Sequence, residues 1–261
     1  MKKGILVVSF GTSYMETLKL NIEACENKIR ESFKEYEIRR AFTSGMIMRK
    51  LKQRDNIHID TVEEALTKMV NDGFEEIIVQ PLHIMPGEEY DDIKRDVHKF
   101  SRINKFENIV LGRPVLYSEE DYRVAVEALK EQLPEYDEKK AVVLMGHGST
   151  HYANACYSML QYIFEDMGVK NVYIATVEGF PELRHVVPKL KEKKIEEITL
   201  MPYMLVAGDH AQNDMAGDEE DSWKVILENE GFKVNIYLHG LGENSAYRDI
   251  YVQHIKDCIN N

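Results

Sequence analysis

The sequence has few cysteines, and they stand far apart. The three are Cys25, Cys156 and Cys258, and none belongs to a C-x-x-C pair. An odd, scattered set offers neither a zinc knuckle nor a disulfide framework, because both of these uses need paired cysteines. The same pattern is typical of a reducing compartment, and we expect a cytoplasmic protein.

Long apolar runs are also missing. None approaches the roughly 20 residues that a membrane-spanning helix needs, so we expect no membrane association. The start, MKKGILVVSF, has the lysines and the apolar run of a signal peptide, but the run stops at Gly11 without a small-residue cleavage site. Positive charge is scarce too, since the net charge is −12. Because no basic stripe is interleaved with aromatic residues, we expect no nucleic acid partner.

The common nucleotide-binding motifs do not occur. The chain holds neither a G-x-x-x-x-G-K-[ST] loop nor a G-x-G-x-x-G turn, so we expect no nucleotide cofactor. The segments GTS at 11–13 and HGST at 147–150 do precede predicted helices, whose free N–H groups could hold an anion.

Apolar strands alternate with amphipathic helices along the whole chain. This alternation predicts an α/β fold in which helices cover both faces of a parallel sheet. The predicted strands are 4–10, 37–43, 76–82, 141–145, 172–177, 195–202 and 234–238. The predicted helices are 17–33, 60–72, 119–133, 153–167, 181–191, 221–230 and 244–260. The second of these helices has Thr61 and Glu64 at capping-box spacing and Gly73 as its stop.

The pattern restarts after the polar segment PEYDEKK, and the two parts of the chain resemble each other. Three pairs match in the same order: VVSFGTS with LMGHGST, RAFTSG with IATVEG, and IIVQPLHIMPGEE with ITLMPYMLVAGDH. Each match lies at a predicted strand end, which indicates a duplication. We therefore predict two similar half-domains, 1–138 and 139–261, each with a parallel sheet flanked by helices. The first half carries an insert near 51–60.

Alignment of the halves selects three polar residues at strand ends of the second half. They are His147, Glu178 and His210, where the first half has Phe10, Ser44 and Glu89. Because ligands of parallel sheets bind beyond the carboxyl ends of the strands, the three side chains should share one edge. Two imidazoles and a carboxylate suit a divalent transition metal. Taken singly, each residue also fits a surface position, and Glu178 fits a helix cap.

The segment Gly-His-Gly-Ser at 146–149 also admits a hydrolase, with Ser149 as nucleophile and His147 as base. Its spacing departs from the G-x-S-x-G nucleophile elbow, and the base would lie too close in sequence for the usual geometry. A zinc-dependent hydrolase that uses the three aligned residues is a separate alternative.

Five segments carry a family resemblance: SFGTS, QPLHIMPGEEY, LMGHGSTHYAN, TVEGFP and PYMLVAGDHAQNDMAGDEEDSW. Together they resemble the anaerobic cobalt chelatases of the CbiK family. These are sirohydrochlorin cobaltochelatases of cobalamin biosynthesis, within the ATP-independent class II chelatases of ferrochelatase-like fold. The resemblance covers essentially the whole chain. It implies insertion of cobalt(II), as the substrate metal, into sirohydrochlorin or precorrin-2 in a cleft between the two halves.

The resemblance also implies roles for the aligned residues. In that family the metal sits on a histidine, a glutamate and a second histidine, and the matching positions here are His147, Glu178 and His210. We expect all three to be catalytic and metal-binding. His147 should take a pyrrolic proton and contact the incoming metal, while the other two deliver cobalt from the same side. Two protons leave the macrocycle, which we expect to be held bent.

An acidic protein must bind a polycarboxylate substrate through local groups. The residues expected beside the substrate are Phe10, Gly11, Thr12, Ser13, His83, Glu89, Gly148 and Ser149. Phe10 would either stack on the ring or fill the core, and Gly148 would let the backbone approach the macrocycle. Alternatives stay open: ferrochelatase or nickel chelatase activity, since the ligand set does not dictate one metal, or a non-catalytic metal- or tetrapyrrole-binding protein. Assembly into a homo-oligomer also stays open.

Overall fold

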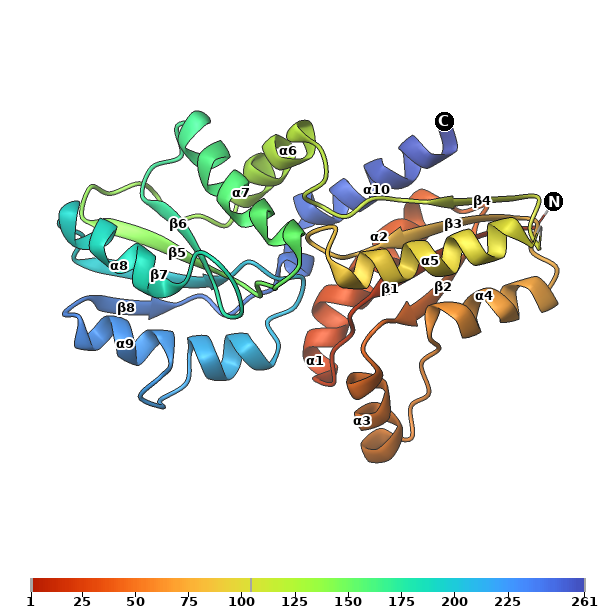
Figure 1. Cartoon of the computed structure of the whole chain (residues 1–261), viewed down its shortest axis with the longest axis horizontal. Helices are drawn as coiled ribbons and strands as arrows, with labels where there is room; N and C mark the ends of the chain where they lie inside the picture. The colour runs from red at the N-terminus through yellow and green to blue at the C-terminus, as the bar shows by residue number, and fades with distance from the viewer. Residues whose placement is uncertain (1, 104, 261) are drawn as a thin grey trace. The chain divides into compact units, whose positions relative to one another are not determined.

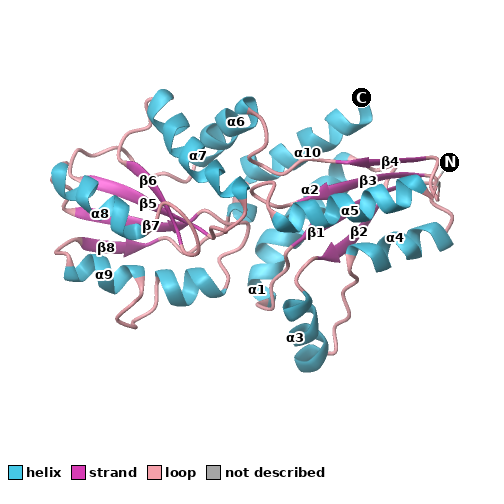
Figure 2. Ribbon diagram, viewed as in Figure 1, coloured by secondary structure: helices cyan, strands magenta, loops and turns pink. Residues whose placement is uncertain are grey.

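The computed structural model describes residues 2–103 and 105–260 and divides the chain into two compact units. Unit 1 comprises Met1–Tyr117 and Ser245–Asn261, and unit 2 comprises Ser118–Asn244. Each unit is built on a four-stranded parallel sheet with helices packed against it (Figures 1 and 2), so the predicted α/β class with two similar sheets is confirmed. None of the helices within the described ranges is long and apolar enough to cross a membrane.

Unit 1 contains the first four strands. They are β1 (Lys3–Ser9), β2 (Glu37–Phe42), β3 (Glu76–Pro81) and β4 (Asn108–Leu111), in the order β2-β1-β3-β4. Its helices are α1 (Met15–Thr17), the π-helix η1 (Leu18–Glu23), α2 (Ala24–Ser32), α3 (Gly45–Asp55), α4 (Val62–Asn71), α5 (Glu88–Arg102) and α10 (Ser245–Asn260). Helix α4 begins with the predicted capping box, in which Thr61 and Glu64 each accept the other's backbone N–H.

Unit 2 repeats this arrangement. Its strands are β5 (Lys140–Gly146), β6 (Val172–Thr176), β7 (Glu197–Pro202) and β8 (Lys233–Ile236), in the order β6-β5-β7-β8. Its helices are α6 (Glu119–Lys130), α7 (Ala155–Asp166), α8 (Leu183–Glu192) and α9 (Trp223–Asn229), with the short helices η2 (Tyr152–Asn154), η3 (Ala211–Met215) and η4 (Leu241–Glu243). The sequence order of strands is thus the same in both sheets.

The two sheets also share their register at the carboxyl ends. The equivalent pairs are Ser9 with Phe42 and Gly146 with Thr176, and Val8 with Pro81 and Met145 with Pro202. Just beyond the strands, the Ser44 N–H donates to the Phe10 carbonyl, and the Glu178 N–H donates to the His147 carbonyl. The backbone therefore places two of the three aligned pairs, Phe10 with His147 and Ser44 with Glu178, at equivalent points, which supports the duplication.

The units differ from the predicted division at 138 and 139 by two exchanged helices. Helix α6 belongs to unit 2, where its Arg123 pairs with Asp166 of α7 at 2.9 Å. Helix α10 belongs to unit 1, where the Tyr251 hydroxyl donates to the Leu82 carbonyl at 3.0 Å. The last helix of the predicted half 1–138 thus packs in unit 2, and the last helix of the predicted half 139–261 packs in unit 1. Strand and helix periodicity does not carry this information, because it reports which face of a helix is buried and not against what.

Three elements of unit 1 were not predicted. Helix α5 has a highly charged sequence, although Tyr90, Ile93, Val97 and Phe100 form a buried stripe at helical spacing. Helix α3 overlaps the predicted insert and buries only Leu51, so its apolar pattern is weak. Strand β4 has four residues and none of them is fully buried.

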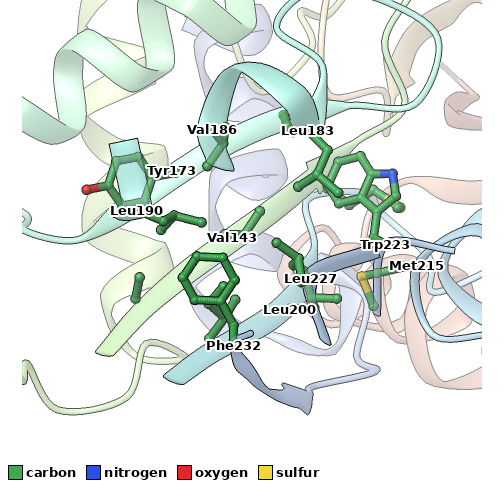
Figure 3. Packing of buried hydrophobic residues seen from close by; sticks show 14 of the residues in the cluster. Val143, Tyr173, Leu183, Val186, Leu190, Leu200, Met215, Trp223, Leu227 and Phe232 are labelled. Atoms are coloured by element: carbon green, nitrogen blue, oxygen red, sulfur yellow. The ribbon is translucent and has the colours of Figure 1, made fainter. Parts of the chain in front are cut away.

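Apolar side chains pack tightly on one face of the unit 2 sheet (Figure 3). Val143 and Leu200 from the sheet meet Leu190 of α8 and Leu227 of α9, and each of the four is fully buried. Met215, the last residue of η3, belongs to the same cluster and is also fully buried. This core fixes the strands of unit 2 and the segment that follows β7.

Replacing Tyr251 by Phe should lower the free energy of unfolding by about 1–2 kcal/mol, because the Leu82 carbonyl loses the buried hydroxyl that donates to it. Urea denaturation measures this. Tyr162→Phe is the matched control, since that side chain is exposed on α7, and it should change stability by less than about 0.5 kcal/mol. Equal stability of Tyr251→Phe and the wild type would show that this hydrogen bond does not hold α10 in unit 1.

Candidate metal centre

Three potential ligands converge at the carboxyl edge of the unit 2 sheet. His147 follows β5, Glu178 lies two residues beyond β6, and His210 directly precedes η3. One donor atom from each lies within 4.8 Å of the others. The two imidazole rings are perpendicular, with centroids 4.7 Å apart, and His147 Nδ1 lies 3.9 Å from Glu178 Oε2. The structure thus brings together the side chains that the alignment selected, while their role as ligands stays a prediction.

Glycines let the loops after β5 and β6 approach closely. Gly148 has a φ of 84°, in the left-handed region that favours glycine. A Cβ added there would lie 2.6 Å from the Gly179 nitrogen and 2.8 Å from the Thr176 Cβ. The space that a side chain would need at Gly148 is therefore filled by the neighbouring loop. This contact is a structural reason for the glycine, whereas its predicted approach to the macrocycle stays a prediction.

The amide of Asn154 joins these two loops. Its Oδ1 accepts the Ser149 N–H at 3.0 Å, and its Nδ2 donates to the Phe180 carbonyl at 2.7 Å. A Cβ on Gly179 would lie 2.3 Å from Asn154 Oδ1, so this glycine is needed for the contact. Asn154 therefore holds the loop of His147 against the loop of Glu178. Sequence reasoning missed it because no spacing marks a residue that bonds only to backbone.

Each histidine of the centre has an oxygen acceptor beside its Nδ1. For His147 it is the Gly148 carbonyl, at 2.9 Å. For His210 it is the Asp214 carboxylate, with 2.5 Å between Nδ1 and Oδ2. An acceptor at this position favours the tautomer that is protonated on Nδ1, which leaves the Nε2 lone pair for a metal or a proton. Asp214 was not predicted, although a histidine and an aspartate four residues apart are a recognisable spacing.

The hydrogen bond of the Ser149 hydroxyl is not the one that a serine nucleophile needs. Its Oγ accepts the His151 N–H at 2.9 Å. Within the described residues no hydrogen bond joins the Ser149 hydroxyl to His147. The geometry therefore lacks the pair of nucleophile and base that the hydrolase alternative requires.

The predicted residues after β1 are placed in unit 1. Phe10 is 43% exposed, so the alternative that it fills the core is wrong. Gly11 has a φ of 97° and repeats the left-handed backbone of Gly148. Thr12 and Ser13 are buried, and Thr12 Oγ1 accepts the Tyr14 N–H. Contact of these residues with a substrate stays a prediction.

His83 and Glu89 also lie in unit 1. Glu89 is half-buried in the first turn of α5. Both ring nitrogens of His83 are buried, and among the described residues neither has a hydrogen-bond partner. Burial lowers the pKa of His83 to about 4, so this imidazole is neutral near pH 7. A neutral, unpartnered imidazole is compatible with the predicted substrate contact, which no contact in the structure tests.

A second group of potential ligands lies in unit 1, formed by His58, Asp60 and Glu64. Lys68 Nζ donates to both oxygens of Asp60, at 2.6 and 2.8 Å. Glu64 is engaged in the capping box with Thr61. Lys68 and the N-terminus of α4 thus already engage the carboxylates of Asp60 and Glu64. The group in unit 2 is therefore the stronger candidate for a metal site.

Similarity to known proteins extends over the whole chain. A family model described as cobalt chelatase (CbiK) matches residues 3–260. Over 260 residues the chain is 43% identical to the sirohydrochlorin cobaltochelatase of Salmonella typhimurium, covering 100% of this chain and 97% of the relative. It is 35% identical to the sirohydrochlorin cobaltochelatase CbiKC of Nitratidesulfovibrio vulgaris, covering 99% and 91%. The solved structure of SirB from Bacillus subtilis with Fe3+ shares the fold, with a TM-score of 0.67 at 18% identity and coverage of 99% and 96%.

Asn154→Ala should loosen both loops of the centre, because the Ser149 N–H and the Phe180 carbonyl lose their partner. Hydrogen–deuterium exchange should become faster in peptides covering 147–152 and 177–181. Gln161→Ala is the matched control, since that amide also bonds a backbone N–H and a carbonyl, those of Ile174 and Val172 on β6. If both variants left exchange in the two loops unchanged, Asn154 would have no such role.

His83→Met should remove a pH dependence of stability. The pKa of His83 is about 4 in the folded chain and about 6.5 when exposed, so the unfolded chain takes up the proton first as pH falls. Stability from this residue is complete above pH 6.5 and is lost on the way down to pH 4. Between pH 7 and pH 5 the wild type should lose about 2 kcal/mol more than the variant.

Methionine is chosen because Met204 occupies the equivalent position of the second half. Urea denaturation at the two pH values measures the difference, and His239→Met, at a half-exposed histidine, is the control. Parallel losses in the wild type and His83→Met would show that His83 is not held neutral by burial.

Proposed function

The chain belongs to the cobalt chelatase (CbiK) family, and from that premise we propose that it catalyses the insertion of cobalt(II) into sirohydrochlorin. His147, Glu178 and His210 bind the metal before it enters the macrocycle. The observation that carries this assignment is their convergence, with donor atoms within 4.8 Å of one another. Cobalt is a substrate of the reaction, so the site has to release it as well as bind it.

The proposed ligand set suits a metal that is bound and then released to the macrocycle. Imidazole and carboxylate bind divalent first-row ions, and all three side chains are partly exposed. A cluster of thiolates would hold the ion much more tightly. None of the three cysteines belongs to the centre, and the group of potential ligands contains no sulfur.

Metal insertion exchanges two pyrrolic protons for one divalent cation, so two protons leave for each cobalt that enters. His147 accepts one of the two protons through Nε2 once the metal has left that nitrogen, since the Gly148 carbonyl lies beside its Nδ1, and the other proton passes to water. The Glu178 carboxylate, 3.9 Å from Nδ1, stabilises the imidazolium that results. The proposal thus gives one histidine a role in both proton transfer and metal contact.

The proposed reaction also specifies which partners take part. Insertion needs no nucleotide, nucleic acid takes no part, and precorrin-2 is an alternative substrate to sirohydrochlorin. The substrate contacts are Phe10, Gly11, Thr12, Ser13, His83, Glu89, Gly148 and Ser149. Cytoplasmic location and assembly into a homo-oligomer stay predictions from the sequence.

The decisive test incubates the full chain anaerobically with sirohydrochlorin and Co2+ and follows the absorbance of the macrocycle. The wild type should insert cobalt well above the uncatalysed rate without added ATP. His147→Ala should reduce the rate by about 10²–10⁴-fold, the usual contribution of a general base. His239→Ala, at a histidine of unit 2 outside the centre, should retain the wild-type rate.

Each contrary result has a distinct meaning. Tight binding of metal and macrocycle without turnover would identify a carrier and refute the enzyme. Faster insertion of Fe2+ or Ni2+ under the same conditions would replace cobalt as the substrate. A fully active His147→Ala variant would refute the role given to His147 alone.

A further inference from the structure

Asp214 lies four residues after His210, and its carboxylate meets the imidazole ring, with 2.5 Å between Oδ2 and Nδ1. We propose that Asp214 is a positioning residue, which holds the His210 ring so that Nε2 is available to the metal and makes that nitrogen a stronger ligand. The proposal rests on the metal-binding role proposed above for His210. It adds a residue that does not itself touch the metal.

The backbone that carries His210 and Asp214 is anchored in the core of unit 2. Ala211 and Met215, the residues directly after His210 and Asp214, are both fully buried in the core of unit 2. They are the first and last residues of the π-helix η3. Gln212 ties the start of this helix back through its side chain, which donates to the Ala207 carbonyl at 3.3 Å. The distance between the two side chains is therefore set by buried neighbours as well as by their own attraction.

A carboxylate partner changes the chemistry of the ring. Histidines that bind metals commonly donate their other N–H to a carboxylate or a carbonyl, which fixes the tautomer and raises the basicity of the ligating nitrogen. The hydrogen-bond acceptor of His210 Nδ1 is charged, whereas that of His147 Nδ1 is the neutral Gly148 carbonyl, and the Glu178 carboxylate lies beyond hydrogen-bond distance of His147, at 3.9 Å. His210 is accordingly the stronger metal ligand of the two, and His147 exchanges a metal for a proton more readily.

The chain offers a matched control for this interaction. His239 and Glu243 are also four residues apart, with 2.8 Å between Nδ1 and the carboxylate. His239 does not belong to either group of potential metal ligands among the described residues. Loss of this second carboxylate therefore removes the same kind of pair without touching the centre.

The experiment titrates the full chain with Co2+ in the absence of tetrapyrrole and follows the visible absorption of bound cobalt. Asp214→Ala should weaken Co2+ binding by about 10–100-fold, the usual effect of losing such a partner. Asp214→Asn keeps an oxygen acceptor without the charge, so its loss should be smaller. Glu243→Ala should bind as the wild type does. At saturation the cobalt spectrum of Asp214→Ala should match the wild type, because the ligands are unchanged.

The outcomes separate this inference from the function it rests on. Wild-type Co2+ affinity in Asp214→Ala would overturn the positioning role, and so would a changed spectrum at saturation, which would make Asp214 a ligand itself. His210→Ala is titrated alongside, and wild-type affinity in that variant would instead refute the metal centre. If Asp214→Ala unfolds at a lower temperature, Asp214→Asn carries the test, because it preserves the hydrogen bond.

Discussion

The pairing of β5 with β6 on one side and with β7 on the other is the constraint on which the candidate metal centre depends. Parallel strands end at the same edge, and the observed register sets Gly146 beside Thr176 and Met145 beside Pro202. This register fixes where His147 and Glu178 leave the sheet, whereas His210 lies eight residues beyond β7 and is placed by the buried residues of η3. A shift by one residue would turn every side chain of a strand to the opposite face of the sheet. Buried faces on these strands make such a shift costly, so the core of unit 2 also protects the geometry of the centre.

The same register occurs in unit 1, where the equivalent positions carry different chemistry. Ser44 caps α3 by accepting the Ile47 N–H, whereas its counterpart Glu178 caps no helix and points its carboxylate towards His147. Phe10 replaces His147 in the same backbone setting, since Gly11 and Gly148 share a left-handed φ. The duplicated scaffold thus keeps its backbone, while at these aligned positions the second copy presents three potential metal ligands and the first copy does not. Divergence of this kind is possible because the strand ends fix where the backbone of a residue lies but do not dictate which side chain it carries.

This separation explains what could be predicted from the sequence. The strands could be predicted from their apolar runs, and the convergence of His147, Glu178 and His210 could be predicted because the aligned strand ends of the two halves are equivalent. Helix α5 was missed because charged residues interrupt its buried stripe. The exchange of α6 and α10 between the units could not be predicted from hydrophobic periodicity, because periodicity shows that a helix has an apolar face but not which element packs against it. Asn154 bonds only to backbone atoms, so nothing in its sequence context distinguishes it from a surface amide.

A site that inserts a metal has to balance capture against release, and its surroundings show how that balance can be set. Close packing of Gly148 and Gly179 holds two of the proposed ligands, His147 and Glu178, on touching loops, which would lower the entropy lost when they close on an ion. Partial exposure of His147, Glu178 and His210 works in the other direction, because water competes for the ion and weakens its attraction to the carboxylate. Under the proposed function, the unequal partners of the two imidazoles give this exchange a direction. The ion leaves the ligand beside a neutral carbonyl more easily than the ligand beside a carboxylate, and the imidazole that it leaves is the one assigned to take the proton.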